Sequence, residues 1–370
     1  MSKSDIAESM AKRIKGWVLL NNPSWTDNEL HEKRLVRKLD IFFASYLAVS
    51  SVVKYLDQTN IGNAYAVSGM QGDLELFGNQ YNFFTTYFNI GYIIMIPISN
   101  FVINSVVRPS IWLPTLEIVW GILTGCLAAV HHYKAVCRYP VPFVAESLPD
   151  GLRFLIGFFE GCASSTNAVA MVLLLSWYLP TEVGKRIAVY NCAASIGGIF
   201  SGALQSALYR NLNGVGGLEG WRWLFVMNAI ITVTVGLWGF LAIPDYPDRI
   251  SPLVRRLWLN EQDEATALRR VGREGPRTPV GWKWNTLTSL VKRKELWAIY
   301  LAYTVLGQGQ SGYVYFNLWL KSLLNPDGTK RYSVYQLNYI PMAGNGTMVV
   351  SLAISMILSD HFGTQWPISK

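Results

Sequence analysis

Three charged residues stand out because they lie within long apolar stretches of the sequence. Asp57 lies in the first of these stretches, and Arg153 and Glu160 lie together in a later one. A charge inside a bilayer costs about 3 kcal/mol on insertion scales, so such residues usually have a partner or a function. A carboxyl group in a poorly hydrated site can bind and release a proton near neutral pH, and a nearby arginine opposes that protonation. These residue types are therefore typical of a switch driven by protons.

The spacing of the later pair places it on one face of a helix. Arg153, Gly157 and Glu160 stand at positions i, i+4 and i+7, and Asn167 extends the same face by two turns. Gly157 leaves room beside the charges, either for a cavity or for a close contact with another helix. The structural alternative to a switch is a static Arg153–Glu160 ion pair that locks two helices together.

The first apolar stretch carries a second polar face. Asp57 and Asn60 are one turn apart, and Lys54 lies one turn before Asp57, where it can neutralise the carboxylate. The positions of Asp57 and Glu160 along their helices predict that both carboxylates face one cavity in the outer half of the bilayer. A structural Lys54–Asp57 ion pair at the outer end of the helix is the alternative to a functional carboxylate.

Other polar side chains lie in further apolar stretches. We expect each of them to contact either a substrate or a neighbouring helix. Gln308, Gln310 and Tyr313 cluster among three glycines, which often mark a broken helix that lines a binding site. Glu117 has no evident partner in the sequence. The remaining candidates are Tyr87 and Asn191.

The composition places these residues in a membrane protein. The chain has 370 residues, of which 51% are hydrophobic and 15% are charged, whereas soluble domains carry about 25% charged residues. Apolar stretches of the roughly 20 residues needed to cross a bilayer recur along the chain. Because the backbone in lipid must satisfy its own hydrogen bonds, each stretch is expected to be a helix. The predicted spans are 39–62, 80–104, 111–131, 151–178, 187–209, 221–243, 295–320 and 336–358.

Hydrophilic segments divide the chain into four parts. A tail over 1–38 precedes a six-helix bundle over 39–243, and a connector loop over 244–294 precedes an incomplete second bundle of two helices over 295–370. The predicted fold class is therefore an all-α membrane protein with about eight transmembrane helices. Lysine and arginine are concentrated in the tail and the connector, which predicts that both are cytoplasmic.

Several classes of function are disfavoured by the sequence. It contains no phosphate-binding loop, no cluster of metal ligands and no arrangement of nucleophile and base, so we expect neither an enzyme nor a bound cofactor. The net charge of +8 lies mostly in the tail and the connector, so it does not indicate nucleic acid; a lipid-binding patch is the alternative interpretation of the basic connector. The expected partners are a small solute, protons and the bilayer, without an obligate protein partner.

Five motifs resemble, in order, those of the anion:cation symporter branch of the major facilitator superfamily, which is related to allantoate permease. The resemblance covers nearly all of the chain from about residue 39. The first motif resembles that of fungal permeases for vitamins and related carboxylates, such as pantothenate, biotin or nicotinate. The five motifs are YLDQTN at 55–60, RxxxGxxEG at 153–161, WYLPTExxKR at 177–186, GWRWLF at 220–225 and PDYP at 244–247.

The resemblance implies uptake of a small organic anion across the plasma membrane, driven by the proton gradient, at a site between two six-helix bundles. Carried over by position, Asp57 and Glu160 are the proton-coupling carboxylates, and Arg153 is the switching partner of Glu160. Tyr87 and Asn191 stand where the family lines its substrate cavity. The full set of candidate substrate-binding residues is Lys54, Gln58, Asn60, Tyr87, Asn167, Asn191, Gln308, Gln310 and Tyr313.

Two departures from the family pattern matter. Many members have an arginine after the first aspartate, and here that residue is Gln58, so Lys54 or Arg153 binds the anion or the substrate is held differently. The second departure is length, because residues 359–363 resemble the start of the loop between spans eight and nine, and family members continue for about four more spans. The alternative functions are therefore a truncated relative that does not transport and a regulatory protein with the fold of half a carrier.

Overall fold

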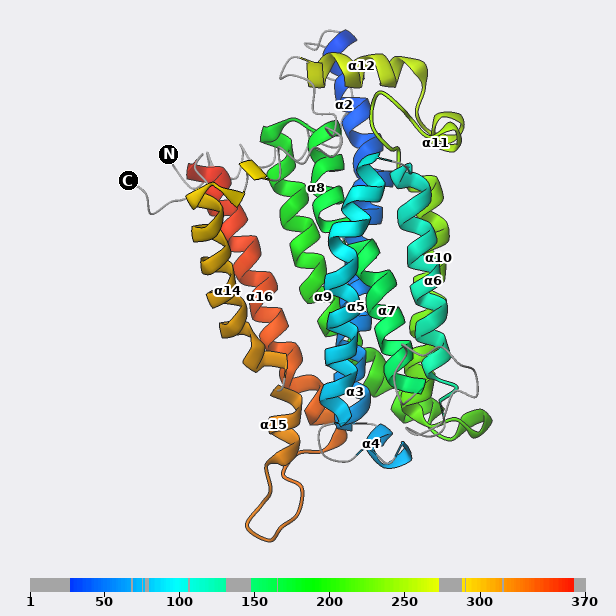
Figure 1. Ribbon diagram of the computed structural model, residues 1–370, viewed down its shortest axis with the longest axis vertical. Helices are drawn as coiled ribbons and strands as arrows, with labels where there is room; N and C mark the ends of the chain where they lie inside the picture. Colours follow the sequence, from blue (N-terminus) through cyan, green and yellow to red (C-terminus); the bar gives the residue numbers. More distant parts are fainter. Residues whose placement is uncertain are drawn as a thin grey trace, which may run out of the picture.

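The computed structural model describes most of the chain as a long helical bundle (Figure 1). The described residues are 27–67, 69–74, 76, 80–105, 107–130, 148–164, 166–272, 288–289, 291–314 and 316–362. They contain helices and a single isolated bridge between Leu324 and Lys330, and no strand is formed within these ranges. The predicted all-α fold class is confirmed.

The long helices of the described ranges coincide with the predicted spans. The first span lies in a continuous helical segment, made of α2 (Asp27–Leu39), the π-helix η1 (Asp40–Ala44) and α3 (Ser45–Val67). The other long helices are α5 (Gln80–Ser105), α6 (Pro109–Leu127), α7 (Leu148–Ser164), α8 (Thr166–Trp177), α9 (Pro180–Leu212), α10 (Gly220–Ala242), α14 (Lys294–Val314) and α16 (Val334–Phe362). The shorter helices are α4 (Met70–Asp73), η2 (Val215–Gly217), α11 (Pro252–Leu257), α12 (Glu261–Gly272) and α15 (Phe316–Ser322).

Four helical segments among the described residues are long and apolar enough, by length and composition, to cross a bilayer. They are Asp27–Tyr65, Pro109–Leu127, Glu182–Leu212 and Gly220–Ala242. Large apolar side chains on the outside of the bundle fit this environment, because lipid does not penalise their exposure. Ile93, Ile122 and Leu237, for example, are each more than half exposed.

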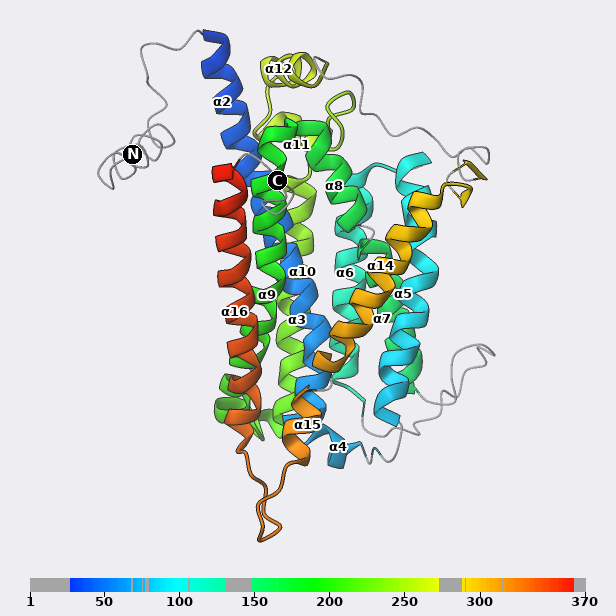
Figure 2. The same ribbon diagram turned by 90° about the vertical axis from the view of Figure 1, so that its left-hand side faces the viewer.

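The bundle is built from helix pairs that pack along their lengths. The main pairs are α5 with α7, α6 with α10, α3 with α9, and α9 with α16. Figure 2 shows α16 running beside α9, while α14 crosses the bundle obliquely. Helix α3 contacts α9, α10, α15 and α16, so its polar face is enclosed by other helices.

Close backbone contact joins α5 to α7. A Cβ atom added to Gly157 would lie 2.1 Å from the carbonyl oxygen of Phe88, and one added to Gly91 would lie 2.4 Å from that of Phe154. The room left by Gly157 is therefore filled by α5 and is not a cavity. Small residues commonly allow such contact between helices in membranes, and here they fix how α7 presents Arg153 and Glu160.

Ion pairs tie the connector to the bundle at the end where α2, α11 and α12 lie (Figure 1). Arg270 of α12 pairs with Glu182 of α9 at 2.7 Å, and Arg186 of α9 pairs with Asp40 of η1 at 2.7 Å. Arg270 is only 3% exposed. The connector helix α12 is thereby fixed onto the first helical segment and the start of α9.

A test of the α5–α7 contact compares two glycines. Gly157→Ala should lower the free energy of unfolding by about 1–3 kcal/mol, because the added methyl group overpacks a contact that cannot relax without moving backbone. The matched control is Gly184→Ala, where nothing lies within 4 Å of the added atom. Thermal unfolding in detergent measures both, and equal stability of the two variants would contradict this description of the contact.

Candidate functional site

Asp57, Arg153 and Glu160 come together in the interior of the bundle. Asp57 projects from α3, and Arg153 and Glu160 project from α7. They are 1%, 3% and 0% exposed, respectively, so all three charged groups are excluded from solvent. Electrostatic interactions link Asp57 with both Arg153 and Glu160. The structure therefore places the three residues in one buried cluster, called the α3–α7 cluster below.

Neutral donors hold the carboxylate of Asp57. The Asn228 amide of α10 donates a hydrogen bond of 2.7 Å to Oδ1, and the Thr124 hydroxyl of α6 donates one of 3.3 Å to Oδ2. Asn228 and Thr124 are both fully buried. Neither residue is among the candidates predicted from the sequence, although each is a polar side chain within a predicted span.

Gln58 holds the second carboxylate. Its amide nitrogen donates a hydrogen bond of 2.7 Å to Oε1 of Glu160, which joins α3 to α7. The other oxygen of Glu160, Oε2, is buried and accepts no hydrogen bond from the described residues. Gln58 is a candidate substrate-binding residue, and in this structure it contacts Glu160, one of the two carboxylates expected to carry protons.

Arg153 is buried without an ion pair to any described residue. Its guanidinium group lies over the ring of Phe88 in α5, 4.7 Å from the centroid, and its Nε atom has no hydrogen-bond partner among the described residues. A static Arg153–Glu160 ion pair is thus absent from the described structure. The described structure has other contacts in place of this bridge: Gln58 donates to Oε1 of Glu160, and Arg153 stacks on Phe88.

Lys54 faces Glu160 and not Asp57. Its ammonium group lies 5.6 Å from the ring centroid of Tyr55 and 5.9 Å from that of Tyr92, and it interacts electrostatically with Glu160. The alternative of a structural Lys54–Asp57 ion pair is not found among the described residues, because the two side chains leave α3 in different directions. Asp57 is turned toward α6 and α10, whereas Lys54 is turned toward Tyr92 of α5.

Asn60 belongs to a chain of hydrogen bonds that joins three helices. Ser201 of α9 donates to Oδ1 of Asn60 at 2.8 Å, and Asn63 donates to Ser201 at 2.9 Å. Asn317 of α15 donates to Oδ1 of Asn63 at 2.9 Å. Lys321 adds a contact of 3.2 Å to the carbonyl of Tyr65. This amide chain connects α3 and α9 to the C-terminal helices near the α4 end of the bundle (Figure 1).

The structure does not bring the other candidates into the α3–α7 cluster. Tyr87 is half-buried and contacts the ring of Phe83, and Asn191 and Gln308 are exposed. Helix α14 runs continuously through Gly307, Gly309 and Gly312, so the broken helix expected there is absent. The side chains of Asn167, Gln310 and Tyr313 lie outside the described residues.

Glu117, for which the sequence offers no partner, has two in the structure. The Tyr46 hydroxyl donates a hydrogen bond of 2.6 Å to Oε2, and the Ser50 hydroxyl donates one of 2.9 Å to Oε1. Glu117 is 2% exposed and lies two turns before Thr124 on α6. The same seam between α3 and α6 therefore carries both Glu117 and the Thr124–Asp57 contact.

Comparison with known proteins places this chain in a family. Residues 47–369 match the Major Facilitator Superfamily model. The MFS transporter PfmaC of Pestalotiopsis fici is 33% identical over 95% of this chain and 61% of its own length. The pantothenate transporter liz1 of Schizosaccharomyces pombe is 29% identical over 94% of this chain and 62% of its own length. The chain thus spans about three fifths of the length of these curated relatives.

A solved structure has the same fold at low sequence identity. The proton:xylose symporter XylE from E. coli matches with a TM-score of 0.55 and 13% identity, over 90% of this chain and 70% of that one. Identity at this level supports the fold alone.

A double-mutant cycle tests the Asp57–Asn228 contact. The variants are Asp57→Ala, Asn228→Ala and the double substitution, each measured by unfolding in detergent. Removing Asn228 leaves a buried carboxylate oxygen without its donor, so we expect a coupling energy of about 1–3 kcal/mol. Asn211→Ala is the matched control, since Asn211 is exposed and bonds only within its own helix. Additive effects of Asp57→Ala and Asn228→Ala would contradict the contact.

Proposed function

The chain belongs to the Major Facilitator Superfamily, and we propose that it is a proton-coupled symporter for a small organic anion, such as a vitamin carboxylate. Its relatives are transporters and not enzymes. The observation that carries the proposal is the α3–α7 cluster, in which two buried carboxyl groups flank a buried arginine that has no ion-pair partner among the described residues. A structural ion pair would have used that arginine.

Arg153 is the proposed contact for the anionic group of the substrate. A guanidinium group binds a carboxylate through two parallel hydrogen bonds, and this geometry is strong when water is excluded. Arg153 is 3% exposed and its Nε is unpartnered within the described structure, so this donor is available to a ligand. Lys54, also buried beside Glu160, supplies a second positive charge. These two cations take the place of the arginine that many relatives carry at the position of Gln58.

Protonation of Glu160 and Asp57 couples the anion to the proton gradient. An ionised carboxylate next to Arg153 competes for the guanidinium group and repels an incoming anion. Proton binding removes that negative charge, so the loaded site holds the substrate and the proton together. Loss of the proton restores the competition and favours release of the anion. Gln58 keeps Glu160 oriented in both states because its amide can donate to either form of the carboxyl group.

The amide chain of Asn60, Ser201, Asn63 and Asn317 is proposed to close one side of the site. It crosses from α3 and α9 to α15 at the end of the bundle that lacks the connector. Transporters of this kind expose a central site to each side in turn, as one group of helices moves against the other. Breaking these few hydrogen bonds releases α15 from α3, which is the movement that outward opening needs.

The orientation and location follow from charge. The basic connector lies at the α2 and α12 end of the bundle, and positive loops favour the cytoplasm. We therefore place this end, the N-terminus included, in the cytoplasm and the α15 end outside. Uptake of a solute with protons from outside fits the plasma membrane.

Replacement of Glu160 tests the coupling step. Glu160→Gln should abolish proton-driven accumulation of the substrate while sparing exchange of internal for external substrate, because the variant cannot release a proton. Glu219→Gln, at an exposed glutamate, is the control and should accumulate substrate like the native chain. Unchanged accumulation in Glu160→Gln would remove Glu160 from the mechanism.

The substrate class is tested by uptake in cells that express this chain. Labelled pantothenate, biotin, nicotinate and allantoate are offered at acidic and neutral external pH, and we expect acid to stimulate uptake of one of them. No uptake of any, with the protein confirmed at the cell surface, would favour the alternative of a membrane protein that does not transport.

A further inference from the structure

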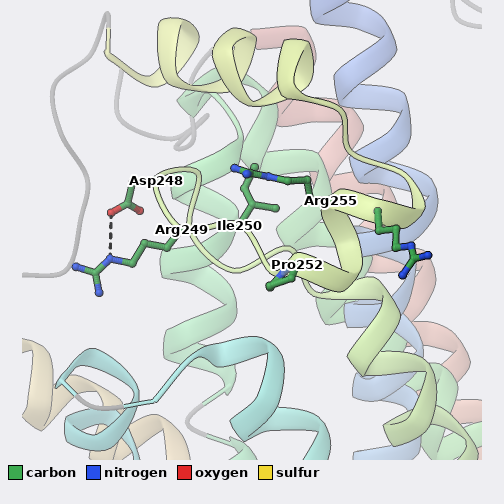
Figure 3. Close-up of a pocket in the computed structure, with 6 residues that line it drawn as sticks. Asp248, Arg249, Ile250, Pro252 and Arg255 are labelled. Atoms are coloured by element: carbon green, nitrogen blue, oxygen red, sulfur yellow. Dashed lines mark ion pairs between the residues drawn. The ribbon is translucent and has the colours of Figure 1, made fainter.

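A basic cavity lies outside the α3–α7 cluster, where the chain leaves α10 and enters α11 (Figure 3). Its volume is about 380 Å³. Three arginines and one acid are among its lining residues, so the lining carries an excess of positive charge. The lining residues are Asp248, Arg249, Ile250, Pro252, Arg255 and Arg256.

The backbone around this cavity is held firmly against the bundle. Trp258, which follows α11, stacks on Phe42 with 4.9 Å between ring centroids and donates a hydrogen bond of 2.9 Å to the carbonyl of Leu241. On the other side, the Asp245 carboxylate accepts hydrogen bonds of 2.6 and 2.7 Å from the backbone and hydroxyl of Ser110. The arginines therefore project from a fixed scaffold, and a ligand does not have to order a loose loop.

Two of the three guanidinium groups are available to a ligand. Arg255 forms an ion pair with Glu264 of α12. The Arg249 side chain is 78% exposed and has only a long contact of 3.7 Å with Asp248, drawn in Figure 3. Arg256 is exposed and forms no ion pair with any residue of the described ranges. The free charges suit a ligand with more than one negative charge.

The outer face of α11 indicates where this ligand comes from. Leu253 and Leu257 are 51% and 57% exposed, and Arg256 lies between them on the same face of the helix. Exposed leucines beside arginine, directly after the end of a transmembrane helix, are typical of a segment that lies at the membrane surface. A soluble anion would gain nothing from the leucines, whereas a phospholipid offers acyl chains beside its headgroup.

We propose that this cavity binds the phosphorylated headgroup of an anionic phospholipid. Arg249 and Arg256 contact the phosphate groups, which guanidinium binds through paired hydrogen bonds, and Leu253 and Leu257 rest on the acyl chains. The cytoplasmic leaflet is the anionic one, and it is the leaflet that the basic connector is expected to face. The site does not depend on which solute the chain carries.

The test uses the full chain in lipid nanodiscs of phosphatidylcholine, titrated with phosphatidylinositol 4-phosphate, with thermal unfolding as the readout. We expect saturable stabilisation of the native chain. Arg249→Gln combined with Arg256→Gln should weaken the apparent affinity for the lipid roughly thirtyfold. Each positive residue near the membrane surface raises that affinity about five- to sixfold. The matched control combines Lys292→Gln with Arg293→Gln, which removes the same charge at two exposed positions outside the cavity.

Two results would overturn the proposal. Equal weakening in both double variants would mean that the lipid is attracted by overall charge and not by this cavity. The second result has two parts: soluble inositol 1,4-bisphosphate stabilises the chain with the same apparent affinity as the lipid, and Leu253→Ser and Leu257→Ser do not change the lipid titration. Together they would mean that the cavity binds free phosphate esters. A preference for the lipid over the soluble bisphosphate, lost in both the arginine and the leucine variants, would support the proposed lipid site.

Discussion

The cost of burying charge in an apolar helical bundle is the constraint on which this structure depends. Asp57, Glu160, Arg153 and Lys54 are all excluded from solvent, and an isolated charge in such an environment is very unfavourable. The bundle meets this cost with neutral donors on the carboxylates and aromatic rings beside the cations. Because the opposite charges are close but not locked together, the cluster suits the proposed response to a proton or to an anion. A tight ion pair would be more static.

Helix packing serves this arrangement. The glycines of α5 and α7 bring the two backbones into contact, which places the Phe88 ring against Arg153. Helix α3 packs against α9 and α10 and is joined to α7 by the Gln58–Glu160 hydrogen bond. It contributes Asp57 to the cluster and Asn63 to the amide chain. A shift of α3 would therefore alter the charged cluster and the amide chain at the α15 end together. In the proposed function, this coupling through one helix is what would link proton binding to alternating access.

Much of the fold and part of the site could be predicted from the sequence. Apolar stretches of span length located the helices, and the spacing of Arg153 and Glu160 placed both on one face of α7. Partners on other helices could not be predicted, since periodicity within one helix does not give its rotation against a neighbour. Thr124 and Asn228 on Asp57, and Tyr46 and Ser50 on Glu117, are contacts of this kind. The same limit explains why the sequence offers Asp57 as a partner for Lys54, whose side chain faces Glu160.

The most direct test of the account is the exchange of protons on binding of the transported anion. Isothermal titration calorimetry of the purified chain, in buffers that differ in ionisation enthalpy, measures the protons taken up when the anion binds at neutral pH. We predict net proton uptake by the native chain, and none by a variant that combines Asp57→Asn with Glu160→Gln. Tight binding to the native chain without any dependence on the buffer would contradict proton coupling at the α3–α7 cluster.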